Sequence, residues 1–521
     1  MRTIILLLAV LAIAACDKEE HSSAESESVE QHKQVGITWF DGSVEQAFAK
    51  ANAAGNPLFL YWGAVWCPPC QEIKSTVFKS QDFINLSRLF IPVYLDGDTD
   101  QAQAWGEKFG VMGYPTMIVF NPTAEEVTRI PGGIDIDRYN SVLELSLNKM
   151  RPTSQLVQYA LTNPDRLDKD DFYQLAYYSW DQDTGAVPEG TDKTELFRVL
   201  AARAPKGELS ARFYLNYLVV AARKLEDDVE TAGELDASDI HDRLTAILSS
   251  DHLTLACWDT LAYYPDELLE MPIFDDDQKQ LLDSLWVNSV FTLRDDASLS
   301  KAEKMSGWLP RLYVATREDK LLDSDIQEKL RKELMSIDED TADAYERQSV
   351  ISRMSYVYRQ AGMKKDAKEL LQAELNRSAS PYYFMSGLAS MTEKDGEFTE
   401  AIDWSRQAWE NSTGQATRLQ WGASYVRALI RMAPDDIALI TSASISLLAE
   451  FHESQALFSG RNFRTLRRLN RQLLDWQDEQ QATEFTFQTR VEEMCSQQLA
   501  DSQEEENCKS LFVEEAVAQA S

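Results

Sequence analysis

Residues 57–70 read PLFLYWGAVWCPPC, an apolar run that leads into two cysteines, Cys67 and Cys70, three positions apart. The run is short and rich in aromatic residues, which is typical of a buried strand. Prolines directly after Cys67 are typical of the first turn of a helix. Further along, residues 113–116 read GYPT and lead into a second apolar run, 117–120. The sequence therefore predicts a strand that ends in a cysteine pair at the start of a helix, and a proline loop before another strand.

Two cysteines at this spacing are compatible with half of a zinc site, a structural disulfide or a redox-active dithiol. Zinc requires further ligands. Neither the five histidines nor Cys257, Cys495 and Cys508 stand at ligand spacing within this region. We therefore expect no metal and no cofactor. The preceding strand, Trp66 and the GYPT loop favour the redox-active dithiol over the structural bridge.

The position of each cysteine predicts its role. Cys67 stands at the expected start of the helix, where unpaired amides and the helix dipole stabilise a thiolate. Cys70 follows one turn later on the same face of the helix. Cys67 should thus be the exposed nucleophile, and Cys70 the buried thiol that resolves the mixed disulfide.

On the motifs WCPPC and GYPT, residues 36–150 resemble the thioredoxin family, and in particular its reducing, periplasmic members. The resemblance covers just over a fifth of the chain. It implies a thioredoxin fold and a cis peptide bond before Pro115, in a loop that lies against the two sulfur atoms. It also implies that Trp66, Tyr114 and Thr116 line a substrate groove, although ordinary core packing is an equal alternative for Tyr114.

Two departures from that family bear on the chemistry. Tyr61 stands where the family has a buried aspartate that assists the resolving cysteine, so this assistance is absent or comes from another group such as Glu72. Pro68 replaces the usual glycine and removes an amide that could have faced the Cys67 sulfur. We therefore expect a weakly stabilised thiolate and a reduction potential of roughly −200 to −270 mV, far from the strong oxidants near −120 mV.

The hydrophobic pattern predicts an α/β thioredoxin-like domain followed by a large all-α array with TPR-like repeats. In the first domain, strands are expected near 37–40, 58–61, 90–95, 117–120 and 128–131, and helices over 43–54, from the cysteines to about 79, over 101–109 and up to 150.

After 150, apolar residues recur at helical spacing over the whole of 151–521. One repeat of 34 residues is visible in 348–412, where Gly362 and Gly396 correspond, as do Ala367 and Ala401. This segment resembles two tetratricopeptide (TPR) repeats. Glu374 breaks the pattern in the first of them.

The N-terminus resembles a bacterial lipoprotein signal. A short basic start and an apolar run, 4–12, are followed by small residues immediately before Cys16. This predicts a signal peptide over 1–15 and a lipidated Cys16, with ordinary secretory cleavage as the alternative. Asp17 resembles an inner-membrane retention signal. Residues 16–35 are rich in Ser and Glu and predict a disordered tether. We expect a periplasmic protein held to a membrane by its lipid.

Two further features lie near the C-terminus. Cys495 and Cys508 flank an acidic loop and are expected to form a structural disulfide that closes a helical hairpin. Five arginines are concentrated in 461–471. They are expected either to pair with this protein's own carboxylates, which we favour, or to contact an anionic partner or lipid headgroups.

The formal net charge is −34, which argues against nucleic-acid binding. The motifs predict a membrane-anchored, periplasmic thiol–disulfide oxidoreductase that reduces or reshuffles the disulfides of client proteins. Such an enzyme needs a membrane thiol reductant as electron donor. The alternative is a chaperone or assembly scaffold whose helical repeats bind clients, with the cysteine-bearing domain as an accessory.

Overall fold

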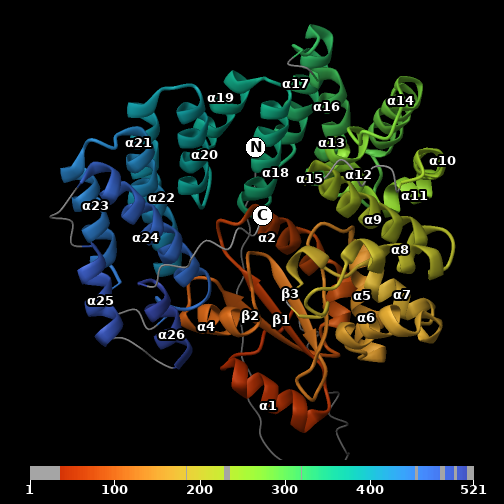
Figure 1. Cartoon of the computed structure of the whole chain (residues 1–521), viewed down its shortest axis with the longest axis horizontal. Coiled ribbons are helices and arrows are strands. Elements are labelled where there is room, and N and C mark those ends of the chain that lie inside the picture. Colours follow the sequence, from red (N-terminus) through yellow and green to blue (C-terminus); the bar gives the residue numbers. More distant parts are fainter. Residues whose placement is uncertain are drawn as a thin grey trace, which may run out of the picture. The chain divides into compact units, whose positions relative to one another are not determined.

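The computed structural model in Figure 1 describes residues 36–512, apart from 184, 228–234, 318–319, 452–455, 482–486 and 498–501. The expected signal peptide, the lipidation site Cys16, Asp17 and the tether lie outside the described residues.

The N-terminal α/β region is built on a mixed four-stranded sheet, whose strands are β1 (Leu58–Gly63), β2 (Ile91–Asp96), β3 (Thr116–Phe120) and β4 (Glu126–Arg129). The order is β2-β1-β3-β4, with β1 and β2 parallel and β3 antiparallel to both β1 and β4. Every residue of β1 is buried. The apolar run before the cysteines is thus an inner strand covered on both faces, as its composition predicts.

Five α-helices flank the sheet: α1 (Val44–Ala54), α2 (Pro68–Ser75), α3 (Gln81–Leu86), α4 (Asp100–Lys108) and α5 (Ile136–Lys149), with the short 3-10 helix η1 (Val77–Lys79) between α2 and α3. Alternate residues of β1 point to opposite faces. Leu60 packs in a cluster with α1 and α4, and Phe59 in a cluster with α3 and α5. The helices therefore form a layer on each side of the sheet.

Two local expectations were wrong, and one helix was missed. Residues 37–40 are not a strand: Phe40 donates one backbone hydrogen bond to Pro92 O at 2.7 Å, but Pro92 has no N–H with which to continue a ladder on that edge of β2. The cysteine helix ends at Ser75 rather than near 79, because Thr76 (φ −114°, ψ −80°) leaves the helical region. Helix α3 was not predicted.

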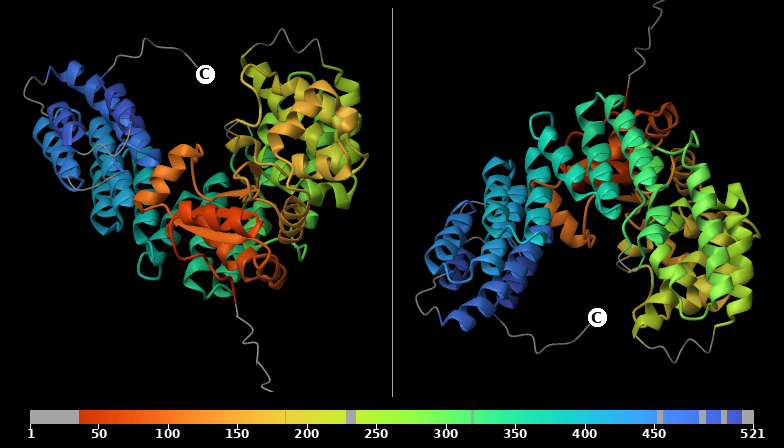
Figure 2. Two further views of the ribbon diagram at one scale, coloured as in Figure 1. Left: turned by 90° about the horizontal axis from the view of Figure 1, so that it is seen from below. Right: turned by 90° about the horizontal axis from the view of Figure 1, so that it is seen from above.

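The chain from 151 onward is helical throughout its described parts. The α-helices are α6 (Thr153–Thr162), α7 (Lys169–Ala176), α8 (Lys193–Arg203), α9 (Glu208–Asp227), α10 (Ala237–Leu248), α11 (Asp251–Ala256), α12 (Trp258–Tyr263), α13 (Pro265–Leu269), α14 (Asp276–Leu293), α15 (Lys301–Ser306), α16 (Leu309–Thr316), α17 (Ser324–Glu339), α18 (Ala344–Gln360), α19 (Lys364–Glu374), α20 (Pro381–Lys394), α21 (Phe398–Asn411), α22 (Gln415–Met432), α23 (Ile437–Ala449), α24 (Gly460–Gln480), α25 (Phe487–Gln497) and α26 (Ser502–Ser510). Two 3-10 helices, η2 (Pro164–Arg166) and η3 (Trp180–Gln182), lie among the first of them. Figure 2 shows these helices following one another around the α/β region, from yellow through green to blue.

Helices α18 to α21 form two helix pairs, consistent with TPR-like repeats. Gly362 and Gly396 lie at equivalent turns and both take a positive φ, 70° and 80°, which glycine adopts without strain. Ala367 and Ala401 are completely buried between paired helices. Glu374, which breaks the sequence pattern, is buried as well, and its carboxylate pairs with the guanidinium of Arg347 at 2.5 Å. An ion pair thus takes the place of a small apolar residue.

The change at residue 150 is one of secondary structure and leaves the hydrophobic core continuous. Residues Leu156, Phe172 and Leu175 belong to the same buried cluster as Phe59 of β1. The backbone carbonyl of Val127 in β4 accepts hydrogen bonds from the first helices that follow. Helices α6 and α7 therefore complete the α/β region on one side.

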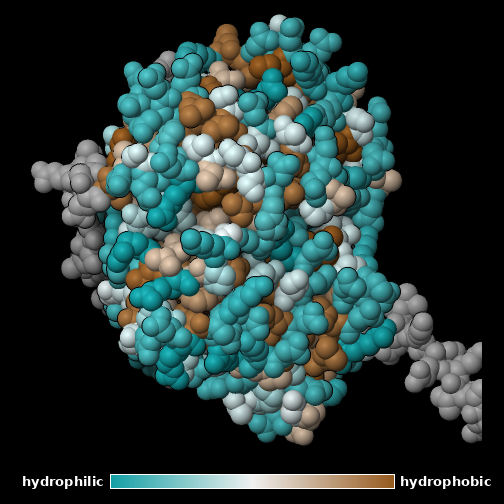
Figure 3. All heavy atoms as spheres, turned by 90° about the vertical axis from the view of Figure 1, so that its right-hand side faces the viewer, coloured by the Kyte–Doolittle hydropathy of each residue, from teal (hydrophilic) through white to brown (hydrophobic). Residues whose placement is uncertain are grey.

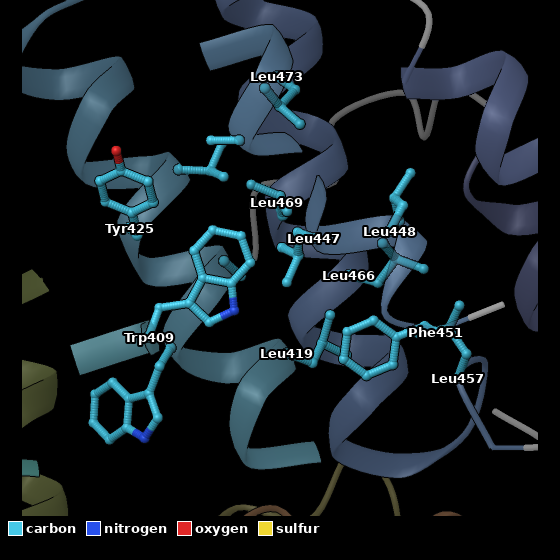
Figure 4. Packing of buried hydrophobic residues seen from close by; sticks show 14 of the residues in the cluster. Trp409, Leu419, Tyr425, Leu447, Leu448, Phe451, Leu457, Leu466, Leu469 and Leu473 are labelled. Atoms are coloured by element: carbon cyan, nitrogen blue, oxygen red, sulfur yellow. The ribbon is translucent and has the colours of Figure 1, made fainter. Parts of the chain in front are cut away.

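A second core lies where the last helices meet. Leu419 of α22, Leu447 of α23 and Leu466 of α24 are fully buried and face one another in Figure 4. The same buried cluster includes Cys67 and Cys70. The cysteine pair is therefore part of the packing of the helical region as well as of the sheet.

The surface drawn in Figure 3 is mostly hydrophilic, with hydrophobic residues scattered over it. None of the helices in the described part of the chain is both long and apolar enough to cross a bilayer.

Candidate active site

Cys67 and Cys70 form a disulfide at the N-terminus of α2, with their Cα atoms 5.2 Å apart. Cys67 is the N-cap residue, and its sulfur accepts a hydrogen bond from Cys70 N at 3.2 Å. The first two helical residues are prolines and carry no N–H. The Cys70 amide is therefore the helix donor directed at the Cys67 sulfur. Both cysteines are almost entirely buried, with 2% and 0% of their surface exposed. The prediction that Cys67 is exposed was therefore wrong, because Cys67 belongs to a buried cluster that includes side chains of the later helices.

Buried hydrogen bonds hold the loop before the cysteine pair in place. Gln71, fully buried in the first turn of α2, donates from its side-chain amide to Ala64 O at 3.2 Å and to Val65 O at 2.7 Å. Cys67 N also donates to Ala64 O, at 3.3 Å. These bonds tie the end of β1 to the cysteine helix and hold the Cys67 backbone in one position.

The peptide bond between Tyr114 and Pro115 is cis. The Tyr114 hydroxyl accepts a hydrogen bond from the side-chain amide of Gln103 at 3.2 Å. Gln182, in η3 of the helical region, donates to Pro115 O at 3.1 Å. Thr116, which we expected in an open groove, is a buried residue of β3 with 1% exposure, and its hydroxyl donates to the carbonyl of residue 113.

Behind the disulfide, Tyr61 and its neighbour Tyr94 on β2 stack at 5.4 Å, in register with each other. The Tyr61 hydroxyl is 3.5 Å from Cys70 O, and burial raises its pKa well above the usual value. Lys74 of α2 lies over the Tyr94 ring, and burial lowers its pKa. Two tyrosines and a lysine therefore line the position where the resembled family has an aspartate.

Glu72, the other candidate for that assistance, accepts a hydrogen bond from the hydroxyl of Ser300, immediately before α15. Burial raises the pKa of Glu72, and the nearby carboxyl of Glu303 on α15 also has its pKa raised, to about 8, by burial and by Glu72. The structure thus places Glu72 in the contact between the cysteine helix and α15.

A family model described as a thioredoxin-like domain matches residues 44–146. These residues form a thioredoxin-like domain. The match includes the sheet, the cysteine pair and the cis bond, and it confirms the predicted fold class of an α/β thioredoxin-like domain followed by a large helical region.

Curated relatives resemble the chain in the same segment. The thiol:disulfide interchange protein DsbD of Klebsiella pneumoniae is 25% identical over 147 residues, which are 27% of this chain and 25% of that protein. DsbD of Haemophilus influenzae is 29% identical over 131 residues, 24% of this chain and 21% of that protein. Protein disulfide-isomerase erp38 of Neurospora crassa is 25% identical over 97 residues, 17% of this chain and 24% of that protein. The chain spans about a quarter or less of the length of these relatives.

The helical region contacts the thioredoxin-like domain directly at Trp66, the residue before Cys67. The indole N–H of Trp66 donates to the Thr417 hydroxyl of α22 at 2.8 Å, and its backbone carbonyl accepts from the Gln348 side chain of α18 at 3.0 Å. The indole stacks on Tyr383 of α20, with ring centroids 6.3 Å apart, and meets Trp421 of α22 edge-on at 6.0 Å. Only 8% of Trp66 is exposed. Trp66 is thus a docking residue for three helices.

Asp98 of the thioredoxin-like domain caps helix α22. Its carboxylate accepts from Thr417 N at 2.7 Å and from the Thr417 hydroxyl at 2.9 Å. Gly414, the residue before α22, has no capping side chain, and a Cβ there would come within 2.3 Å of the Asp98 carboxyl carbon. The thioredoxin-like domain therefore supplies the N-cap that α22 lacks in its own sequence.

Helix α24 is capped in the same way, by α4. The carboxylate of Glu107 accepts from Gly460 N at 2.8 Å, and the side-chain carbonyl of Gln103 accepts from Asn462 N at 3.1 Å. Ser459, directly before α24, makes no side-chain capping bond to the helix. Sequence reasoning missed all three capping residues, because each cap is more than 300 residues away from its helix along the chain.

The remaining predicted site residues lie elsewhere. Cys495 and Cys508 form a disulfide between α25 and α26. Cys257 is a buried free thiol, and burial raises its pKa to about 12. Of the clustered arginines, Arg464 donates to Val111 O at 2.6 Å, with its guanidinium 3.9 Å from the Glu107 carboxylate. Arg461 lies over the Trp66 ring.

Proposed function

We propose that this protein is a thiol–disulfide oxidoreductase that reduces or reshuffles client disulfides through Cys67 and Cys70. One observation carries the proposal: a cysteine pair bridged at a helix N-terminus, on a matched thioredoxin-like domain. The relatives named as interchange and isomerase proteins support the same chemistry. The formal net charge of −34 gives no support to nucleic-acid binding.

In the reducing direction, the Cys67 thiolate attacks one sulfur of the client disulfide, and the other client sulfur leaves as a thiolate. The Cys70 thiol then loses its proton and attacks the Cys67 sulfur, which releases the second client thiolate. The client gains two electrons and two protons, and the Cys67–Cys70 disulfide forms. A dithiol donor then reduces that disulfide and returns the enzyme to its starting state.

For the cellular setting, we propose a periplasmic protein whose lipidated Cys16 anchors it to the membrane, with Asp17 favouring the inner one. The small residues before Cys16 and the Ser- and Glu-rich segment after it support this setting. The electron donor would be a membrane thiol reductant, because a reductase in an oxidising compartment needs a source of electrons.

A second candidate is a client-binding scaffold in which the redox site is an accessory. One observation favours it: helices α18, α20 and α22 line a pocket of about 240 Å³ beside Trp66, with Tyr383, Phe384 and Trp421 in its wall. Such a pocket can hold a client side chain without thiol chemistry.

The deciding experiment measures the Cys67–Cys70 potential in the full chain. The protein is equilibrated in glutathione or dithiothreitol buffers, and alkylation of the peptide containing both residues is quantified by mass spectrometry, which separates it from Cys495–Cys508. A value below about −230 mV supports the reductase, and one above about −180 mV supports an oxidase or isomerase.

The scaffold reading is tested by a Cys67→Ala/Cys70→Ala variant in cells. Loss of client reduction with retained client binding supports the oxidoreductase. Unchanged client handling by this variant, or a wild-type pair that does not exchange with either buffer, refutes it. A matched Cys257→Ala variant controls for the loss of a thiol, because Cys257 is buried away from the site.

A further inference from the structure

Helix α24 presents two of its arginines to the thioredoxin-like domain. Arg464 has an ion-pair partner there, Glu107, and a backbone partner, Val111 O. Arg461, one turn earlier on the same face, forms no ion pair with the carboxylates of the described residues. The expectation that these arginines pair with the protein's own carboxylates is therefore wrong for Arg461.

The guanidinium of Arg461 lies between the two aromatic walls of the cysteine site. Its central carbon is 4.8 Å from the ring centroid of Trp66 and 5.2 Å from that of Tyr114. The two ring centroids are 6.4 Å apart. Trp66 directly precedes Cys67, and Tyr114 directly precedes the cis proline. The cation is thus held at the mouth of the redox site by a helix about 390 residues away in sequence.

A cation in this place is energetically costly unless an anion accompanies it. Burial lowers the pKa of Arg461, with Tyr114 acting in the opposite direction. Asp98 also faces it, but both of its carboxylate oxygens are engaged by Thr417. In the disulfide form the sulfur atoms carry no charge. When the disulfide is reduced, an anion appears next to Trp66.

We propose that Arg461 is the counter-ion of the Cys67 thiolate, supplied to the thioredoxin-like site by the helical region. This inference rests on the proposed dithiol function. The prolines that follow Cys67 remove two of the amides that could stabilise the anion, and the Cys70 amide remains. Arg461 adds a second source of positive potential where the helix itself is poor in donors. The cation–π contacts with both rings fix the guanidinium in the site.

Other charged groups around the site also affect the stability of the Cys67 thiolate. Arg464 on α24, Asp98 after β2 and Tyr114 interact electrostatically with Arg461. On the cysteine side, the Tyr61 hydroxyl lies 3.5 Å from Cys70 O, and Glu72 and Lys74 follow the cysteines on α2. Glu72 is hydrogen-bonded to Ser300 on the side of α15. Replacement of Arg461 alone leaves all of these in place, so the resulting change reports on the Arg461 charge.

The test is a thiolate titration in the full chain carrying Cys16→Ser and Cys70→Ser. Cys67 is then the one ordinary thiol that titrates, because Cys495 and Cys508 are bridged and burial raises the pKa of Cys257 to about 12. Thiolate absorbance near 240 nm is followed against pH with and without Arg461→Met. Loss of a nearby cation should move the Cys67 midpoint up by about one pH unit, which is about tenfold less thiolate below that midpoint.

Two companion variants complete the experiment. Arg467→Met is the matched control, since Arg467 is an exposed arginine of the same helix that lies over Phe463, and it should leave the midpoint unchanged. Arg461→Lys keeps the charge and should recover most of the shift, which also covers the case in which Arg461→Met does not fold.

The outcomes separate this inference from the proposed function. Equal Cys67 midpoints with and without Arg461→Met in the Cys16→Ser, Cys70→Ser chain, or an equal rise in Arg467→Met, overturn the counter-ion role. If the wild-type cysteine pair cycles normally in glutathione buffers at the same time, the proposed oxidoreductase stands. A pair that fails to cycle overturns the proposed function whatever the titration gives.

Discussion

Replacing Asp98 by alanine removes the contact through which the thioredoxin-like domain caps helix α22. The substitution leaves Thr417 N and the Thr417 hydroxyl without their acceptor, and the hydroxyl in turn holds the Trp66 indole. Gly414 has no side chain that could replace the lost acceptor.

The magnitude follows from the bonds that are lost. A hydrogen bond to a charged group contributes about 1.5–3 kcal/mol, and loss of an N-cap costs about 0.5–2 kcal/mol. Burial raises the pKa of Asp98, so the ionised carboxylate is destabilised by its surroundings and part of the gain is offset. We expect Asp98→Ala to weaken the docking of α22 by about 2 kcal/mol.

The assay measures how fast a phosphine reduces the Cys67–Cys70 disulfide under native conditions. Since the two cysteines are almost unexposed, reduction should require local opening of the contact with the helical region. A loss of about 2 kcal/mol increases the open population about thirtyfold, and the reduction rate should rise by up to this factor. Unfolding in urea gives the accompanying loss of stability.

Two matched variants sharpen the result. Asp98→Asn keeps an oxygen that can accept from Thr417 N and should show a much smaller rise. Asp100→Ala removes an exposed carboxylate two residues further on, at the start of α4, and should be reduced at the wild-type rate. If Asp98→Ala is reduced at the wild-type rate although its urea midpoint has fallen, the helical region does not control access to the disulfide, and the reasoning is refuted.

Three further predictions concern other parts of the chain. Glu374→Ala leaves the buried Arg347 guanidinium with Asp338 as its remaining carboxylate partner and should lower the unfolding free energy by about 1.5–3 kcal/mol. Arg347→Met with Glu374→Leu should recover most of this loss, and equal losses in both variants would contradict the prediction. Glu303 has a folded pKa of about 8 against an ordinary 4.5, so its contribution to stability is complete below pH 4.5 and is lost as the pH rises to about 8. Glu303→Gln should therefore flatten the fall of the urea midpoint between pH 5 and 8. An unchanged slope would count against this contribution of Glu303. Cys16→Ser should move the protein from the membrane pellet to the soluble fraction of cells, and continued sedimentation with membranes would exclude the lipid anchor.

The thioredoxin-like fold was predictable because its signals are local. A short aromatic-rich run identifies β1, and the prolines after Cys67 mark the start of α2 within one residue. Helix α3 was missed because its six residues carry too few apolar positions to show a period. The expected strand 37–40 failed because its pairing depends on a partner, Pro92, whose lack of an N–H is visible only once the two segments lie together.

The contact between the two regions was not predictable in the same way. Asp98, Gln103 and Glu107 are ordinary polar residues in sequence, and they gain a role from helix ends more than 300 residues away. One signal was present: the segment 461–471 concentrates positive charge in an acidic chain. We expected these arginines to pair with the protein's own carboxylates. The first of them, Arg461, lies instead against the rings of Trp66 and Tyr114 beside the cysteine pair.

The proposed redox chemistry therefore depends on the whole chain. A fragment that ends at residue 150 would keep both cysteines but lose Thr417, Gln348 and Arg461, and with them the bonds to Trp66 and the nearby cation. It would also expose the side of the sheet that α6 and α7 cover, since these helices share its buried cluster. Its cysteines would be more accessible, and on the counter-ion argument the Cys67 thiolate would be less stable, so the fragment should be the stronger reductant of the two. The helical region thus acts on the dithiol itself, by limiting access to it and by setting the charge around it.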